Sequence, residues 1–313
     1  MSESDDGFIN SKVEILQLFS SLDDVDLDSI ERWICSQSYK KDLAQMKALQ
    51  NTEKKLIKIG KTIKALIPLE AEMPSENIVP PKIGSSADCT VVNTCHIDEF
   101  LYDEKEVEKL VESGKFKRHY CSDCNSRNVV PLIYTSHSMS RPALQYIFKV
   151  LLPDDLEDKQ ILDVGSRIGA VLYGAYYYSN VSTIIGVEMN KEFCDLQESI
   201  LAQYSIDNNR VKVVHSDVVE RSDIVASSNI IVINILDFFV NPEKQKEMWK
   251  FFKKHIRKGS YLICNRSMDD TLDMLDLSEE FMDWLSICKP HQMDNEIFLN
   301  VEDYSEIFLY TIN

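Results

Sequence analysis

Apolar residues return at helical spacing in the first part of the chain and in short, alternating blocks in the second. The sequence predicts helices over residues 12 to about 67, where large apolar side chains recur every three or four positions. They include Val13, Leu16, Phe19, Leu22, Ile30, Trp33, Ile34, Leu56, Ile59, Ile63 and Leu66. Gly60 is expected to weaken the last helix, which Pro68 ends. Residues 69–88 follow as a linker rich in proline, glycine and serine.

Strand-like and helical blocks alternate from residue 140 onward. Ser140 is the predicted N-cap of a first helix, with Pro142 in its first turn. Five apolar strands follow in order, over residues 160–164, 183–188, 211–215, 230–234 and 261–264. Strands that alternate with helices form a parallel sheet with both faces covered. Two further strands, 296–301 and 306–312, are expected to form an antiparallel hairpin through a turn at residues 302–305.

The first of these strands ends in a glycine turn with a particular charge pattern. Residues 161–169 read Ile-Leu-Asp-Val-Gly-Ser-Arg-Ile-Gly. A dinucleotide site needs a second glycine where Arg167 stands, and Asp163 would repel a pyrophosphate. S-adenosylmethionine has no phosphate, and its ammonium would be attracted by a carboxylate at the end of the strand. The turn therefore favours S-adenosylmethionine over NAD.

Two more acidic residues follow the next strands. Glu188 closes the second strand, where a carboxylate can accept hydrogen bonds from a ribose diol. Asp217 follows the third strand, where it can accept from an adenine amino group while Val218 packs against the ring. Because parallel strands present their carboxyl ends at one edge, these residues are expected to meet there.

With these motifs, residues 140–313 resemble the class I S-adenosylmethionine-dependent methyltransferases. Motif I corresponds to Asp163, Gly165 and Gly169, the second acidic motif to Glu188 and the third to Asp217. The resemblance implies a doubly wound α/β sheet with a C-terminal antiparallel hairpin, binding S-adenosylmethionine. The implied cofactor-binding residues are Asp163, Gly165, Ser166, Gly169, Glu188, Met189, Asp217, Val218 and Asn234.

The resemblance leaves the acceptor open. Asn234 occupies the motif IV position beside the methyl group, but no proline pair follows it, which disfavours DNA adenine and glutamine-type substrates. Asp237 or His215 could remove a proton from the acceptor, or they could be a helix cap and an ordinary end of a strand. Residues 1–139 are expected to hold the acceptor. Because Arg167 departs from the glycine pattern, a catalytically silent protein that senses the cofactor or scaffolds a complex is the alternative.

Residues 89–139 contain four of the eight cysteines and three of the six histidines, together with a charged helix over residues 104–112. They are predicted to form a small Cys/His subdomain. Cys121 and Cys124 resemble a zinc knuckle, and Cys95 and His96 could complete a tetrahedral set, with Cys89 or His119 as substitutes. A buried pair of free thiols and a redox pair are the other interpretations of Cys121 and Cys124.

Composition narrows the class of protein. The 313 residues carry a formal net charge of −17, which disfavours general nucleic-acid binding and leaves a protein or small molecule as the favoured acceptor. No apolar run is long enough to cross a membrane, and residues 1–8 are polar, so a cytoplasmic or nuclear protein is expected. Four parts are predicted: a helical region 1–68, which could bind a protein partner, a linker 69–88, the subdomain 89–139 and the methyltransferase domain 140–313.

Overall fold

The computed structural model describes residues 3–84, 86–90, 92–121, 129–131, 133–234, 236, 238–299, 304 and 306–313. It divides into two compact units, residues 1–51 and residues 52–313. No helix among the described residues is long and apolar enough to cross a membrane.

The described residues of the first unit, 3–51, are mostly helical, in agreement with the helices predicted from residue 12 onward. They comprise α1 (Glu3–Ser20), α2 (Asp24–Cys35) and the first half of α3 (Tyr39–Lys64). The first helix begins earlier than expected, at residue 3. Asp23 caps α2 by accepting a hydrogen bond from the Asp26 N–H at 2.9 Å. The indole N–H of Trp33 donates to Asp42 at 2.7 Å, which ties the end of α2 to the start of α3.

Residues 52–313 contain one large sheet, two small sheets and the helices that cover them. After α3 come β1 (Thr94–His96), α4 (Glu104–Glu112), β2 (His119–Cys121), β3 (Val129–Pro131), β4 (Ile133–Thr135), α5 (Arg141–Tyr146), η1 (Ile147–Leu151), β5 (Gln160–Val164), α6 (Ala170–Tyr178), β6 (Thr183–Glu188), α7 (Lys191–Gln203), β7 (Val211–His215), η2 (Val218–Glu220), α8 (Ser222–Ser227), β8 (Ile230–Ile233), α9 (Pro242–His255), β9 (Tyr261–Cys264), α10 (Met268–Met274), β10 (Leu285–Ile287), η3 (Met293–Phe298) and β11 (Phe308–Ile312).

The large sheet has seven strands in the order β10-β11-β9-β8-β5-β6-β7. Strands β5 to β9 are parallel, and β11 runs antiparallel to both β9 and β10. The chain leaves β5 on one side toward β6 and β7, then returns to add β8 and β9 on the other. This reversal makes β5 the centre of a doubly wound sheet, whose ligand site is expected at the carboxyl ends of β5 and its neighbours.

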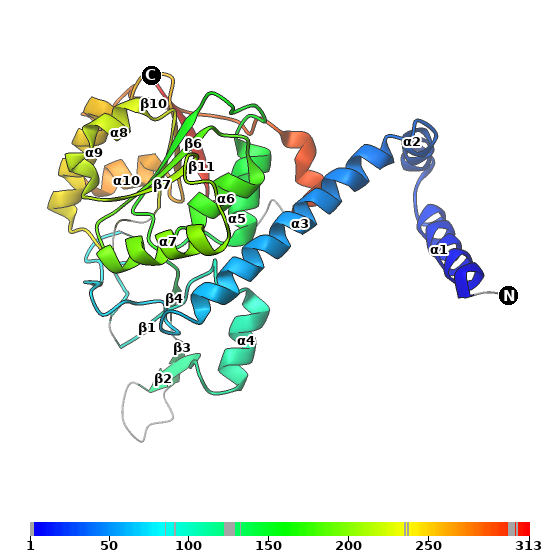
Figure 1. The fold of residues 1–313 in the computed structure, drawn as a ribbon, viewed down its shortest axis with the longest axis horizontal. Coiled ribbons are helices and arrows are strands. Elements are labelled where there is room, and N and C mark those ends of the chain that lie inside the picture. Colours follow the sequence, from blue (N-terminus) through cyan, green and yellow to red (C-terminus); the bar gives the residue numbers. More distant parts are fainter. Residues whose placement is uncertain are drawn as a thin grey trace. The chain divides into compact units, whose positions relative to one another are not determined.

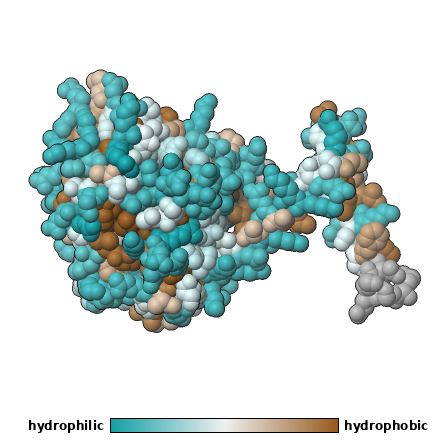
Figure 2. Space-filling model, turned by 45° about the horizontal axis from the view of Figure 1, so that its top comes forward, coloured by the Kyte–Doolittle hydropathy of each residue, from teal (hydrophilic) through white to brown (hydrophobic). Residues whose placement is uncertain are grey.

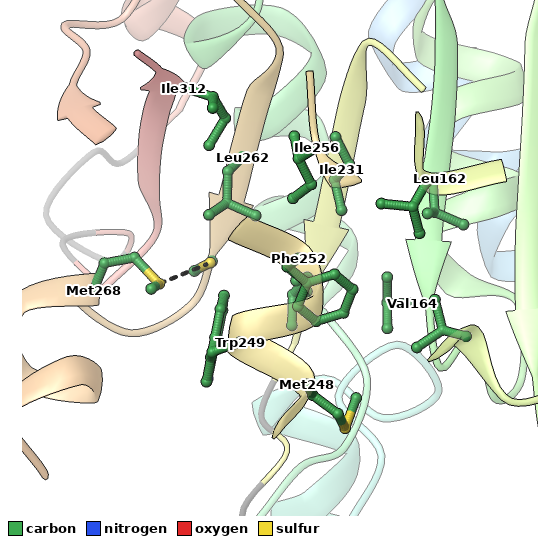
Figure 3. Packing of buried hydrophobic residues seen from close by; sticks show 14 of the residues in the cluster. Leu162, Val164, Ile231, Met248, Trp249, Phe252, Ile256, Leu262, Met268 and Ile312 are labelled. Atoms are coloured by element: carbon green, nitrogen blue, oxygen red, sulfur yellow. Dashed lines mark hydrogen bonds between the residues drawn. The ribbon is translucent and has the colours of Figure 1, made fainter. Parts of the chain in front are cut away.

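Helices cover both faces of this sheet (Figure 1). On one face, α8, α9 and α10 pack on inward-facing strand residues in a cluster whose members are each less than a tenth exposed. Figure 3 shows Trp249 and Phe252 of α9, and Ile256 directly after it, lying against apolar side chains of the sheet. On the other face, Gly174 of α6 lies so close to Leu144 of α5 that a Cβ there would be 3.1 Å from the leucine side chain. Ser140 caps α5 as predicted, accepting from the Ala143 N–H at 3.2 Å.

The C-terminal hairpin is the part of the predicted fold that is wrong. Residues 293–298 form the 3-10 helix η3, and the partner of the last strand is β10, some twenty residues before it. Residues 300–303 and 305, which include most of the predicted turn, lie outside the described residues. The side-chain amides of Gln292 and Asn295 attach the start of η3 to η1. They donate to the carbonyls of Leu152 and Lys149 at 2.5 and 2.6 Å.

Residues 69–84 lie against the sheet and are not a free linker. The Val79 N–H donates to the Phe238 carbonyl at 2.9 Å, and Ile83 packs on the apolar cluster of the sheet. Gly60 does not interrupt α3. A Cβ there would lie at an ordinary contact distance of 3.7 Å from the Phe100 carbonyl oxygen, so the helix packs on residues 100–101 without requiring a glycine.

Candidate cofactor site

The three predicted acidic residues lie at the ends of consecutive strands. Asp163 sits in β5, in register with Gly186 of β6 and Val232 of β8. Glu188 is the last residue of β6, and Asp217 follows β7. Since β5, β6 and β7 are adjacent and parallel, the three carboxylates line one edge of the sheet, beside the reversal at β5.

The turn after β5 uses left-handed backbone conformations at three residues. Gly165, Arg167 and Gly169 have φ angles of 72°, 46° and 86°. No other heavy atom lies within 4 Å of the place where a Cβ on Gly165 would be, so the turn faces open space there. At Gly169 a Cβ would be 2.7 Å from the Tyr173 hydroxyl. The first glycine leaves room for a ligand, and the second is needed for packing.

Asp163 is the residue whose environment most clearly suits a cation. It is 4% exposed, and burial, followed by the charge of Glu188, raises the pKa of its carboxyl to about 8. A positively charged group beside it would offset this cost. The ammonium of S-adenosylmethionine has that charge, and the open side of Gly165 lies next to the strand end. The residues of the turn therefore fit this cofactor.

Glu188 is buried and already holds two backbone amides. Its Oε2 accepts from the Arg167 N–H at 2.8 Å and its Oε1 from the Asn190 N–H at 2.7 Å. Burial raises the pKa of its carboxyl, and these two hydrogen bonds lower it. Each carboxylate oxygen can accept a second hydrogen bond. Glu188 can thus bind a diol while it holds the glycine turn against β6.

The side chain of Arg167 is held by residues from the N-terminal region. Its Nε donates to Glu76 at 3.0 Å, its Nη1 to Asp98 at 3.2 Å and its Nη2 to the Ala71 carbonyl. The guanidinium also lies 5.0 Å from the ring centre of Phe193. The arginine that departs from the glycine pattern therefore pairs with two acidic residues that precede the methyltransferase domain. Nothing in the sequence marked Glu76 and Asp98 as its partners.

The remaining predicted cofactor residues lie around the same edge. The Asp217 carboxylate accepts from the Val219 N–H at 3.1 Å and caps η2, which begins with the buried Val218. Ser166 donates to Gln197 at 2.9 Å, so its hydroxyl is engaged within the protein. Met189 is 66% exposed and could lie over a bound nucleoside.

Asn234, at the motif IV position, contacts His137, a residue that the sequence analysis did not single out. The Asn234 Nδ2 donates to the His137 carbonyl at 3.0 Å. The buried Asn234 Oδ1 and His137 Nδ1 have no hydrogen-bond partner among the described residues. His215 is exposed, with its Nε2 2.9 Å from the Met189 carbonyl, and Asp237 lies outside the described residues. Two buried polar atoms thus remain for a ligand to satisfy beside the end of β8.

A cavity of about 620 Å³ lies near these residues, within the range of small-molecule sites. Its wall includes His96, whose Nδ1 is 2.7 Å from the His137 Nε2, and Phe238, which lies a few residues after Asn234. Glu70 and Glu72 also line it. Burial and repulsion from Glu76 and Glu70 raise the pKa of Glu72. His96 lines the cavity and contacts His137, which in turn contacts Asn234. This histidine pair therefore connects the cavity wall to the motif IV position.

The residues proposed for zinc are only partly described. No group of three or more His, Cys, Asp or Glu residues is placed to hold a metal ion in the part of the chain that the structure describes. Cys124 lies outside that part, as does the side chain of Cys121. His96 pairs with His137, and the Sγ of Cys95 lies 3.9 Å from the His96 carbonyl. Zinc binding by Cys121 and Cys124 stays a prediction.

No model of a known protein family matches the sequence, and no curated protein matches it. Solved methyltransferase structures resemble parts of the chain. An RNA methyltransferase from Salinibacter ruber, bound to S-adenosyl-L-homocysteine, is 12% identical over 41% of this chain and 76% of its own, with a TM-score of 0.33. An S-adenosylmethionine-dependent O-methyltransferase from Thermotoga maritima is 15% identical over 50% and 56%, with a TM-score of 0.37.

A provisionally assigned methyltransferase from Streptococcus mutans is 14% identical over 54% of this chain, with a TM-score of 0.38, and this chain spans 46% of its length. The strand order gives a more direct basis for describing the fold. A doubly wound sheet, an antiparallel last strand and a glycine turn flanked by strand-end acids occur together here. The protein has a class I methyltransferase-like fold.

Proposed function

We propose that the protein is an S-adenosylmethionine-dependent methyltransferase. The buried Asp163 carboxyl supports this most, because it lies at the end of the central strand beside an open glycine turn. The cofactor ammonium would offset the desolvation that raises the pKa of Asp163 to about 8. Glu188 would then accept from the ribose and Asp217 from the adenine.

The cavity of about 620 Å³ would receive the acceptor. It is bounded by the N-terminal region, where the acceptor was expected, and by Phe238 after the motif IV position. The net charge of −17 favours a protein or small-molecule acceptor over a nucleic acid. The wall itself combines Glu70 and Glu72 with Lys115 and Lys117, so it can pair with groups of either charge. Asn234 and the pair of His96 and His137 would position its nucleophile, and positioning supplies much of the rate in such transfers.

Calorimetry with S-adenosylmethionine, S-adenosyl-L-homocysteine and NAD tests the cofactor part of the proposal. The first two should bind and NAD should not. Binding of NAD alone would overturn it. Glu188→Gln should weaken cofactor binding about tenfold, the usual cost of one charge-assisted hydrogen bond. Glu188→Ala is the poorer variant, because it would leave the amides of both Arg167 and Asn190 without their acceptor, whereas the glutamine oxygen keeps one of these two hydrogen bonds.

Transfer of a labelled methyl group into cell extract, separated into protein, RNA and small molecules, tests the reaction itself. We expect label in the protein or the small-molecule fraction. His137→Ala removes the side chain beside Asn234 and should lower transfer while cofactor affinity is kept, whereas His255→Ala on the far end of α9 serves as the control. Label in RNA alone would contradict the proposed acceptor class.

A second candidate is a catalytically silent protein that binds the cofactor as a signal. The contacts of Ser75 and Glu76 favour this candidate, because they fix residues 75–76 beside the end of β6. Ser75 accepts from the Asn190 side chain at 2.8 Å and donates to Glu192, close to where the nucleoside would lie. Cofactor binding without transfer to any fraction would support this candidate.

A further inference from the structure

The apolar side chains of α1 and α2 are uncovered. Phe8 is 70% exposed, Leu16 is 54% exposed and Val25 is 73% exposed. The others exposed by more than a third are Ile9, Val13, Ile15, Leu18, Trp33 and Ile34. Figure 2 shows this as brown surface along the helices that follow the grey N-terminus. Among the described side chains of residues 7–51, Leu49 is the large apolar residue that is buried.

Helices of this kind are stabilised by packing, not by their own propensity. Phe8, Ile15 and Phe19 lie on one side of α1, and Ile9, Val13 and Leu16 lie beside them, so the apolar stripe is wider than a solvated helix carries. Exposed patches of contiguous apolar residues mark interaction surfaces. We therefore expect the apolar surface of α1 and α2 to be buried against a binding partner.

The charges of α1, α2 and α3 indicate the identity of this binding partner. Residues 3–35, which span α1 and α2, contain nine acidic residues and two basic residues, Lys12 and Arg32. Residues 39–64, which form α3, contain eight lysines and two acidic residues. Leu43 and Met46 on α3 are each 43% exposed. One chain thus carries an acidic apolar surface and a basic surface with exposed apolar residues that complements it.

We propose that residues 3–64 form a self-association surface, on which α1 and α2 of one copy lie along α3 of a second copy. In a twofold dimer each copy gives its acidic helices and receives those of the other, so the charge complementarity is satisfied twice. A second copy is the one partner certain to present both surfaces. The dimer does not depend on the proposed methyl transfer.

Sedimentation equilibrium of the full chain from about 1 to about 100 μM tests the proposal in the range where such dimers dissociate. The apparent mass should rise from 36.1 kDa toward twice that value. Salt should weaken the association, because charges on exposed helices are screened. A mass that stays at 36.1 kDa at low salt, with the helices intact by circular dichroism, overturns the proposal.

Leu16→Asp and Gln17→Asp are a matched pair on α1. Both add one carboxylate to neighbouring exposed positions, but only Leu16 belongs to the apolar stripe. Leu16→Asp should raise the dimer Kd more than about tenfold, as the loss of an apolar anchor does. Gln17→Asp should change it by less than about threefold, as expected for a single exposed charge. Equal effects of the two variants overturn the proposed contact.

Charge reversal tests which helices meet. Asp28→Lys with Glu31→Lys reverses charge on α2, and Lys47→Glu with Lys54→Glu reverses it on α3; each pair alone should weaken self-association. Mixing the two double variants should restore it, because each supplies the charge that the other lacks. If mixing restores nothing, α1 and α2 cover their own α3 or another protein. Binding of a labelled RNA that is lost with the α3 reversal in a monomeric protein would assign the lysines to nucleic acid instead.

Discussion

At the scale of single residues, Arg167 combines a strained backbone with a buried charge. Its φ of 46° lies in the left-handed region, which costs a residue with a Cβ about 1–2 kcal/mol. Glycine would avoid that cost, but it could not hold Glu76 and Asp98. Asp98 is 1% exposed, and burial raises the pKa of its carboxyl despite the nearby guanidinium. The contacts of its side chain therefore offset the strain of the backbone.

Arg167→Gly should lower the free energy of unfolding by about 3–5 kcal/mol, because it leaves the buried carboxylates of Glu76 and Asp98 without their cation. Arg221→Gly breaks an ion pair with the largely exposed Asp223, which water screens, and should change the stability far less. Urea unfolding of both variants makes the comparison. Cofactor affinity should be kept or improved in Arg167→Gly, since its side chain is bound by residues 71–98. Equal losses of stability would show that the pairs of Arg167 are no stronger than surface pairs.

Asp163 gives the fold a pH dependence of defined sign. Its pKa is about 8 in the folded protein and 3.8 as the ordinary value, so between these values the folded state holds a proton that the unfolded state has lost. Stability therefore falls as the pH rises from about 4 to about 8. Asp163→Asn should raise Tm at pH 8 by at least the equivalent of about 1 kcal/mol, little at pH 4, and should abolish cofactor binding. Thermal melts across this range check it; a variant that is less stable at pH 8 would contradict the sign.

The sequence located the strand ends at which Asp163, Glu188 and Asp217 lie, because apolar periodicity marks the strands. Their role in binding the cofactor stays a prediction. Glu76, Asp98 and His137 could not be predicted, because they reach the site through tertiary contacts across residue separations of 69 to 97. No local pattern distinguishes them from other polar residues in loops.

At the scale of elements, the two glycines of the turn after β5 have different roles: Gly165 leaves space for the ligand, and Gly169 is needed for packing on Tyr173. Gly169→Ala should destabilise the protein more than Gly165→Ala, because its Cβ meets the Tyr173 ring while Gly165 faces open space. Both variants carry the left-handed backbone cost of about 1–2 kcal/mol. For cofactor affinity the order should reverse, since only the Cβ of Gly165 enters the ligand side. Melting temperatures and calorimetry on both variants give the two orders, and the same order in both would contradict this division.

Elements with a strong local signal matched their predictions closely. The strands 160–164, 183–188, 211–215 and 261–264 have the predicted bounds, since each is an apolar run closed by turn residues. The predicted strand 296–301 failed because side-chain amides of Gln292 and Asn295 fix η3 on residues 149–152. Alternation of apolar and polar residues could not reveal that contact.

At the scale of residues 52–313, the N-terminal segment and the sheet form one site. Glu76 holds Arg167, whose backbone amide is held by Glu188, and Ser75 holds Asn190 at the start of α7. Val79 adds a backbone hydrogen bond to Phe238. A ligand that binds Glu188 and the glycine turn is therefore mechanically connected to residues 71–79. Composition alone described this stretch as a linker because its prolines and serines are also typical of loops that cross a surface.

Cofactor binding should therefore slow amide hydrogen exchange in residues 71–79 together with the turn at residues 165–169. The reason is that a ligand on Glu188 restrains the amide of Arg167 and, through its guanidinium, Glu76. Mass spectrometry of peptic fragments with and without S-adenosyl-L-homocysteine measures this, with β10 as the internal control because it lies at the opposite edge of the sheet from β6 and β7. In Glu76→Gln the slowing should persist at residues 165–169 and diminish at 71–79. Faster exchange of residues 71–79 on binding would mean that the cofactor displaces them, and that the arrangement described here is a closed form of the site.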